Sequence, residues 1–276
     1  MKIACIQYAA SSDWAKDVDT ALNMLEDAVD NGATFAVLPE YCAGLWSSEG
    51  QLMVSAFREA EHPVLHAFAD FARKHEIELL VGSIGIAADD GRRFNSSVLL
   101  SATGSIAARY DKIHLFDVNL QDQQIRESLA VAPGEQLVVS TVGSIQIGMS
   151  VCYDLRFPQI YRRYAQAGAS LITIPAAFTK HTGIAHWHTL IRARAIETGC
   201  FIVAADQCGC IENGIDLYGH SIIVDPWGRI VAEAGDGPEV LVASIDLTQV
   251  AEARQNIPAW SKQPSDDPAL VSLIYK

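Results

Sequence analysis

The stretch IQIGMSVCYDLRFP, residues 145–158, decides the fold because it joins a buried strand to a helix through a reactive turn. Its first part, residues 145–151, is mostly apolar, which is typical of a fully buried strand. Pro158 is a favoured first residue of a helix, and the spacing of residues 159–167 predicts a helix there. Cys152 therefore lies between a strand end and a helix start. We expect nearby backbone N–H groups and the helix dipole to favour its thiolate, although free cysteines are often buried and inert.

The same alternation of strands and helices extends along the whole chain. Strands are predicted at residues 2–8, 34–38, 79–85, 95–100, 105–109, 145–151, 171–174, 201–205, 221–224, 230–234 and 240–246. Helices are predicted at residues 17–31, 63–75, 159–167 and 187–198. This mixture of βαβ units and hairpins indicates an α/β protein with two mixed sheets and helices outside them. We expect a single domain over residues 1–276, with an irregular tail from about residue 258 that lies on a neighbouring surface.

Composition excludes several classes of partner. The chain has 276 residues, of which 50% are hydrophobic, and a formal net charge of −13. Nucleic acids and anionic membranes attract basic surfaces, so neither is an expected partner. No apolar run approaches the roughly 18 residues of a membrane span, and the N-terminus does not read as a signal peptide. The six cysteines are scattered, so we expect reduced thiols and a cytoplasmic location.

Four segments place reactive side chains at the ends of predicted elements: LPEY (38–41), YDKIHLF (110–116), RES (126–128) and VCYD (151–154). Glu40 follows a buried strand, and partial desolvation suits such a carboxylate to act as a general base. Lys112 is a cation that could stabilise a developing oxyanion. Taken singly, Glu40 and Lys112 fit an ordinary solvated loop glutamate and surface lysine better than a catalytic role, and the local signal for Glu127 is weaker still.

Taken together and in this order, the four segments resemble the nitrilase superfamily of carbon–nitrogen hydrolases. The resemblance extends from Lys2 to about Asp246 and implies a four-layer α-β-β-α sandwich. It also implies that Glu40 is the general base, Lys112 the oxyanion-stabilising cation, Glu127 an auxiliary carboxylate and Cys152 the nucleophile. The backbone N–H of Tyr153 would be the second oxyanion donor. The family further implies a homodimer that pairs helices near the site, and residues 159–167 and the C-terminal tail are the segments expected there.

Longer motifs narrow the resemblance to the branch that holds ω-amidases and deaminated glutathione amidases. They are YDKIHLFD (110–117), CYDLRFP (152–158), TGIAHW (182–187) and LIRARAIET (190–198). The stretch AAFT (176–179) and the end of the last motif favour the deaminated glutathione amidases. One departure stands out, because His188 occupies a position where many relatives carry Glu. If this position contacts substrate, the substrate assignment changes.

The implied reaction is hydrolysis of a small linear amide to a carboxylic acid and ammonia through a Cys152 thioester. No metal and no organic cofactor is needed. A substrate that carries a carboxylate requires a cation, and Arg156, just past the nucleophile, is the best candidate because guanidinium grips carboxylate with two hydrogen bonds. Phe178 and Thr179 follow the strand that ends at Pro175 and could line the same pocket. Structural roles for all three residues remain open.

Several other functions stay open from the sequence alone. Within the enzymes, the alternatives are an ω-amidase acting on 2-oxoglutaramate, an N-carbamoyl amino acid amidohydrolase and a nitrilase. A zinc hydrolase would draw on a group of histidines and cysteines: His181, His186, His188, Cys208 and Cys210. A papain-like hydrolase would use His114 or His220 as its base. A degenerate family member would act as a binding subunit without catalysis.

Overall fold

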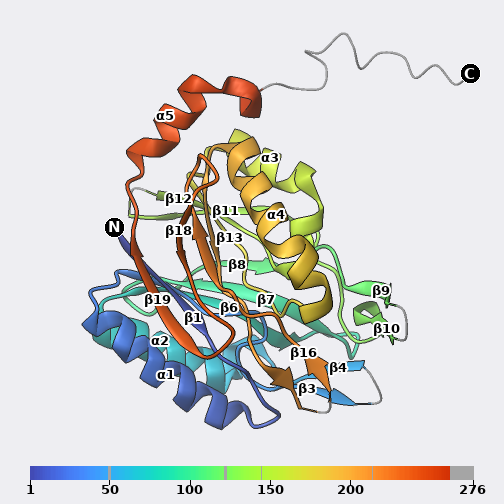
Figure 1. Cartoon of the computed structure of the whole chain (residues 1–276). Helices are drawn as coiled ribbons and strands as arrows, with labels where there is room; N and C mark the ends of the chain where they lie inside the picture. Colours follow the sequence, from blue (N-terminus) through green and yellow to red (C-terminus); the bar gives the residue numbers. More distant parts are fainter. Residues whose placement is uncertain (49–50, 121–122, 144, 213, 262–276) are drawn as a thin grey trace, which may run out of the picture.

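The computed structural model describes residues 1–48, 51–120, 123–143, 145–212 and 214–261. Two large β-sheets lie face to face between two pairs of helices (Figure 1). Helices α1 (Trp14–Asp30) and α2 (Pro63–His75) cover the outside of one sheet, and α3 (Pro158–Gln166) and α4 (Lys180–Thr198) cover the outside of the other. The predicted α/β fold and the four-layer α-β-β-α sandwich are therefore confirmed.

The first sheet has seven strands, six of which follow the order β19-β1-β2-β6-β7-β8, while β5 also pairs with β6. Their bounds are β1 (Lys2–Gln7), β2 (Phe35–Val37), β5 (Ala56–Phe57), β6 (Glu78–Ala87), β7 (Arg93–Leu100), β8 (Ile106–Asp111) and β19 (Glu239–Ser244). Strands β1, β2 and β6 run parallel, and β7 and β8 form the predicted antiparallel hairpin. The parallel centre brings the carboxyl ends of β1, β2 and β6 to one edge.

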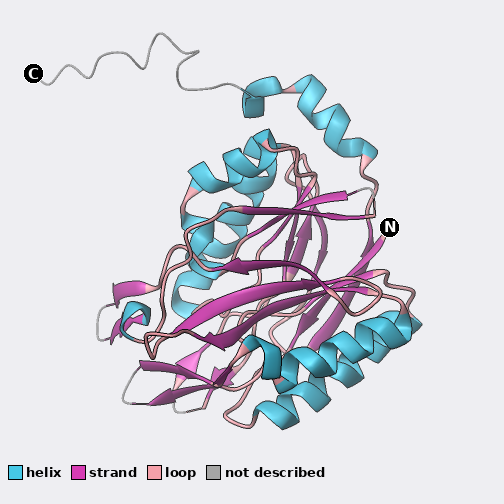
Figure 2. Cartoon of the chain, turned by 180° about the vertical axis from the view of Figure 1, so that it is seen from behind, coloured by secondary structure: helices cyan, strands magenta, loops and turns pink. Residues whose placement is uncertain are grey.

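The second sheet has six strands in the order β11-β12-β13-β14-β17-β18. Their bounds are β11 (Val138–Val142), β12 (Ile145–Met149), β13 (Leu171–Thr173), β14 (Phe201–Ala204), β17 (Ile222–Val224) and β18 (Ile230–Glu233). Strands β12, β13 and β14 run parallel, as in the first sheet, and β17 and β18 form an antiparallel hairpin. Seen from behind, the strands of both sheets lie between the outer helices (Figure 2).

Alternation along the strands separates two cores. In β1, Ile3 and Cys5 belong to the cluster that fills the space between the sheets and continues under α3 and α4, whereas Ala4 and Ile6 belong to the cluster under α1 and α2. Successive strand side chains point to opposite faces, so one strand serves both cores. In β12, Ile147 is buried in the first cluster, while a Cβ placed on Gly148 would lie 2.8 Å from the Tyr164 ring of α3.

Helix α4 is longer than predicted, because it begins at Lys180 and not at residue 187. Its first two turns lack a buried apolar stripe: Ile184 is 68% exposed, and Gly183 packs so closely on Tyr218 that a Cβ there would lie 2.2 Å from the ring. The periodicity that predicts a helix is therefore weak in these turns. The side chain of Trp187 is fully buried, and the residue lies within the helix and not at its cap.

Short elements complete the fold around the sandwich. They are β3 (Leu45–Ser48), β4 (Gln51–Val54), η1 (Glu59–Glu61), β9 (Asp117–Leu120), β10 (Gln123–Arg126), η2 (Glu127–Leu129), η3 (Cys152–Arg156), β15 (Cys210–Ile211), β16 (Ile215–Asp216), α5 (Thr248–Asn256) and η4 (Pro258–Ser261). The start of the predicted tail, η4, rests on α3, where Arg162 donates a hydrogen bond to the carbonyl of Ala259 (2.8 Å). The tail beyond residue 261 lies outside the described residues.

Candidate active site

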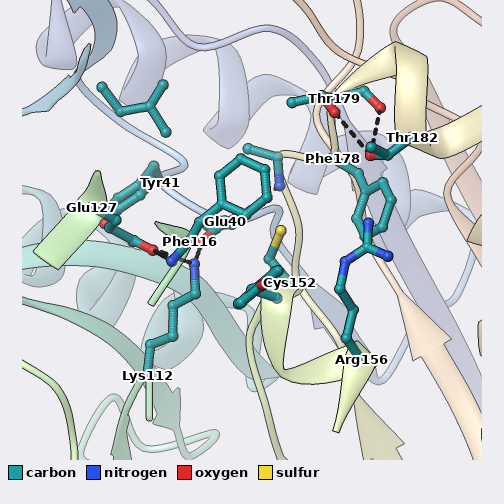
Figure 3. Close-up of a pocket in the computed structure, with 13 residues that line it drawn as sticks. Glu40, Tyr41, Lys112, Phe116, Glu127, Cys152, Arg156, Phe178, Thr179 and Thr182 are labelled. Atoms are coloured by element: carbon teal, nitrogen blue, oxygen red, sulfur yellow. Dashed lines mark hydrogen bonds and ion pairs between the residues drawn. The ribbon is translucent and has the colours of Figure 1, made fainter. Parts of the chain in front are cut away.

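A pocket between the two sheets gathers all eight site residues predicted from the sequence (Figure 3). It is a small pocket that opens to solvent. The predicted residues in its wall are Glu40, Lys112, Glu127, Cys152, Tyr153, Arg156, Phe178 and Thr179. The remaining lining residues are Tyr41, Leu52, Phe116, Ala177 and Thr182.

Each sheet contributes part of this pocket. Glu40 follows β2 and Lys112 follows β8, so both come from the first sheet. Cys152 follows β12 and opens η3, so this thiol comes from the second sheet. Glu127 is the first residue of η2, which follows β8 of the first sheet and precedes β11 of the second sheet along the chain. Residues at the ends of strands are held by the rigid sheets, which fixes their positions relative to one another.

The ammonium group of Lys112 lies between two carboxylates. Its Nζ is 2.8 Å from Oε1 of Glu40 and 2.9 Å from Oε2 of Glu127, and all three side chains are at most 3% exposed. Burial alone would lower the pKa of Lys112, but the charges of Glu127 and Glu40 outweigh it and hold that pKa well above its ordinary value. Lys112 is therefore a permanent cation that faces the pocket.

Glu127 is the most heavily bonded group of the site. Burial alone would raise its pKa, but Lys112 and the hydrogen bonds from Phe116 and Asn95 hold the pKa of Glu127 below its ordinary value. Its Oε1 accepts from the Tyr41 hydroxyl (2.8 Å) and from Nδ2 of Asn95 (3.1 Å), and its Oε2 accepts from the Phe116 N–H (2.6 Å). These bonds keep Glu127 ionised and fixed in place.

Asn95 is a site residue that the sequence reasoning missed. Its Nδ2 donates to Oε1 of Glu40 (2.8 Å) as well as to Glu127, so one amide joins the two carboxylates. Its backbone carbonyl also accepts from the N–H of Lys112 (2.9 Å). Its local sequence, RFNSSVLL, carries no signal that separates Asn95 from Ser96 and Ser97, which are equally buried.

Cys152 has a strained backbone and a neutral thiol. Its φ is +44°, a left-handed value that non-glycine residues rarely adopt, and its N–H donates to the carbonyl of Pro175 (2.8 Å). Burial raises the pKa of Cys152 well above 9.0, the Glu40 carboxylate raises it further, and Lys112 only partly opposes them. The predicted resting thiolate is therefore wrong. The turn after Cys152 is a five-residue 3-10 helix, too short to provide a substantial dipole.

Glu40 is positioned to receive the thiol proton. Its Oε1 is held by Lys112 and Asn95, and its Oε2 accepts from the N–H of Ala177 (2.8 Å). Cys152 lines the same pocket, and the charge of Glu40 raises the pKa of its thiol. The carboxylate is thus desolvated, as expected, and is held on both oxygens.

Arg156 and Phe178 form one wall of the pocket, as Figure 3 shows. The Arg156 guanidinium lies over the rings of Phe178 (5.2 Å) and Tyr153 (5.8 Å), and its Nη1 is 3.2 Å from Nδ1 of His186. Within the part of the chain that the structure describes, no carboxylate pairs with Arg156, so the structural salt bridge is not observed. Thr179 bonds through its hydroxyl to Thr182 (2.8 Å).

The histidines of the two rival hydrolases lie elsewhere. Nδ1 of His114 is 2.7 Å from Asp154 and its ring stacks on Phe157, so it does not line the pocket with Cys152. His188 also lies outside the pocket wall; it contacts Glu233 and lies near His220. The departure at position 188 therefore does not touch the pocket, and the zinc set predicted from the sequence is not assembled.

Known proteins have sequences and folds similar to those of this chain. The carbon-nitrogen hydrolase family profile matches residues 2–255. The deaminated glutathione amidase of Synechocystis sp. is 34% identical over 262 residues, which cover 93% of this chain and 95% of that protein. The yeast Nit3 structure, a member of branch 10 of the nitrilase superfamily from Saccharomyces cerevisiae, is 28% identical with a TM-score of 0.83 and 94% coverage of both chains.

A larger relative has a similar fold over part of its length. The NitFhit protein of C. elegans is 31% identical with a TM-score of 0.86; the match covers 96% of this chain and 65% of that one. The family profile alone spans nearly the whole described part of the chain, and the two sheets that carry the pocket lie within it. The protein therefore belongs to the carbon–nitrogen hydrolase family of the nitrilase superfamily, whose members act on carbon–nitrogen bonds other than peptide bonds.

Proposed function

We propose that the protein is a thiol-dependent amidohydrolase that cleaves a small linear amide through a thioester on Cys152. The observation that carries this proposal is that one pocket wall holds the buried thiol of Cys152 and the carboxylate of Glu40, which accepts a hydrogen bond from the Lys112 ammonium at 2.8 Å. These are the three groups that an acyl transfer requires: a nucleophile, a base and an electrostatic stabiliser.

In the first half of the reaction, Glu40 takes the thiol proton as Sγ of Cys152 attacks the amide carbonyl. Because the thiol stays protonated at rest, this proton transfer belongs to the attack itself. The carbonyl oxygen becomes an oxyanion, which Lys112 and the N–H of Tyr153 stabilise in a water-poor pocket. Glu127 does not react; it holds the ammonium of Lys112 in position.

In the second half, Glu40 returns the proton to the leaving nitrogen. Ammonia leaves from a primary amide and an amine leaves from a secondary amide, and the acyl group remains on Cys152 as a thioester. Glu40 then takes a proton from water, whose oxygen attacks the thioester carbonyl, and the thiol is restored as the acid departs. Every step uses groups of this chain alone.

For the substrate, we propose an amide that carries a carboxylate, as deaminated glutathione does. The named activity of the Synechocystis relative supports this choice, and so does the Arg156 guanidinium at the pocket wall, which has no carboxylate partner among the described residues. Phe178 and Thr179 would contact the rest of the molecule. The runners-up are 2-oxoglutaramate, an N-carbamoyl amino acid and a nitrile, which the same reacting groups could process.

The test is a measurement of acid and amine or ammonia products from purified protein over a panel of these four compounds. Cleavage that disappears in Cys152→Ala supports the thiol mechanism, and the preferred compound decides the substrate. Arg156→Met should lower kcat/KM for a carboxylate-bearing amide by about ten-fold or more and leave an uncharged amide unchanged. Arg163→Met, an exposed arginine of α3, is the matched control. Product formation that survives in Cys152→Ala would refute the mechanism.

We further propose a single functional domain, a cytoplasmic location and a homodimer. The six cysteines are all free thiols, which suits a reducing compartment. No helix in the described ranges is long and apolar enough to cross a membrane. The exposed apolar side chains of Ile184 and Ile196 on α4 support a subunit contact beside the pocket. Sedimentation of the purified chain tests the dimer.

A further inference from the structure

Three side chains with metal-binding atoms converge on the outside of the second sheet, away from the catalytic pocket. His188 comes from α4, His220 from the segment before β17, and Glu233 from the end of β18. One ligand atom from each lies within 4.8 Å of the others. We propose that these three residues form a binding site for a divalent transition metal ion of the zinc type.

The spacing of the ligand atoms fits such an ion. Nε2 of His188 and Nδ1 of His220 are 2.8 and 2.9 Å from the same oxygen of Glu233, Oε1. Zinc binds imidazole nitrogen and carboxylate oxygen at about 2.0–2.2 Å, so neighbouring ligands of a tetrahedral ion are roughly 3.3 Å apart. A shift of roughly half an ångström of each imidazole relative to Oε1 of Glu233 would give these two pairs that spacing. The three side chains are 24–31% exposed, which leaves room for water as the fourth ligand.

A second observation concerns the far nitrogen of His220. Its Nε2 is 2.9 Å from Oδ1 of Asp236, the arrangement that orients metal-binding histidines in proteins. An Nε2–H that donates to Asp236 leaves the lone pair of Nδ1 directed at a carboxylate oxygen of Glu233. Two lone pairs at 2.9 Å repel unless a cation lies between them. The ring of Tyr218 stacks on His220 (4.6 Å between centroids) and fixes its plane.

The site would act as a clamp and not as a catalytic centre. None of its residues lines the pocket of Cys152. However, the N–H of Tyr218 donates to the carbonyl of Phe178 (2.8 Å), and Phe178 belongs to the pocket wall. An ion that joins His188 of α4 to Glu233 of β18 would thus stabilise the start of α4, where Thr182 completes that wall.

Zinc titration followed by calorimetry tests the proposal, and it does not depend on the proposed function. The measurement uses Cys152→Ala, in which zinc cannot bind the nucleophile. We expect one Zn²⁺ per chain, and a Kd that rises about ten-fold or more in His188→Gln. Asp236→Asn, which keeps the shape but alters the partner of His220, should raise the Kd by about ten-fold. His181→Gln, an exposed histidine of the same helix, should leave the Kd unchanged.

Cobalt substitution identifies the ligands directly. Co²⁺ bound by nitrogen and oxygen shows visible d–d absorption without the thiolate charge-transfer band that Cys210, the exposed cysteine, would produce. The proposal is overturned if no saturable binding occurs, if His188→Gln binds as tightly as the parent, or if a thiolate band accompanies binding.

Discussion

Nζ of Lys112 lies 2.8 Å from Oε1 of Glu40, and the two side chains are 2% and 3% exposed. A second carboxylate, Glu127, shares the same ammonium group at 2.9 Å. Burying three charges is costly, and this cluster is tolerable because each charge has a partner and further hydrogen bonds. Its arrangement provides both the base and the oxyanion cation of the proposed reaction, so it links stability to catalysis.

Removing the cation should damage both properties. Lys112→Met leaves two buried carboxylates without their shared partner, so we expect the free energy of unfolding to fall by about 3–5 kcal/mol and hydrolysis to disappear. Chemical denaturation followed by circular dichroism measures the first effect. The control is Lys74→Met, because the Lys74 side chain is 69% exposed in its ion pair with Glu26 and should matter little. Equal stability of the two variants would contradict this view of the cluster.

Glu40→Gln should separate thiol reactivity from turnover. Glu40 raises the pKa of Cys152, so the amide should lower that pKa and increase the thiolate fraction at pH 7–8. Alkylation of Cys152 by iodoacetamide should therefore become faster. In contrast, kcat/KM should fall by about 100-fold or more, because the general base is missing. The rate in Cys152→Ala gives the background from other thiols. If alkylation slows together with turnover, Glu40 activates the thiol already at rest.

The left-handed backbone of Cys152 predicts an unusual order of stability. At φ = +44°, glycine avoids the Cβ clash that every other residue suffers. Cys152→Gly should therefore be about 1 kcal/mol more stable to unfolding than Cys152→Ala. At Cys5, which lies in the extended strand β1, the order should reverse. A Cys152→Gly variant less stable than Cys152→Ala would show that the turn is unstrained.

Because His62 is buried and its pKa is lowered, we expect the protein to lose stability in mild acid. Burial lowers the pKa of His62 to about 4 from its ordinary 6.5, while Nε2 faces the Gly85 carbonyl. The unfolded chain then binds more protons between these values, so stability is full above pH 6.5 and falls as the pH drops toward 4. The largest loss is about 3 kcal/mol. His62→Gln should flatten this part of the unfolding profile, and His181→Gln, at an exposed position of α4, should not.

The sequence allowed prediction of features that local patterns encode. Buried strands that end in polar residues indicated Glu40 and Cys152, and the resemblance added the roles of Lys112 and Glu127. Asn95 escaped notice because its meaning depends on two carboxylates that only the folded sheet brings together. The protonation of Cys152 was mispredicted for the same reason, since burial and Glu40 set it.

The start of α4 shows a different limit. Its helical turns near Gly183 gain their stability from contact with Tyr218 and not from a periodic apolar face. Periodicity cannot detect a helix whose packing partner is a single ring from a distant loop. The triad of His188, His220 and Glu233 is invisible in the sequence for the same reason, because its members are separated along the chain by at least a dozen residues.

The first sheet carries Glu40 and Lys112, and the second carries Cys152. The thickness of the apolar layer between the sheets therefore sets the distance from Sγ of Cys152 to the carboxylate of Glu40. Side chains such as Val37 and Ile147 fill that layer at a distance from any substrate. Positional errors of about 1 Å can cost two orders of magnitude in rate. The turnover number of the proposed reaction therefore depends on the spacing between the two sheets. A substitution that thins the core modestly would lower this rate before it unfolded the protein.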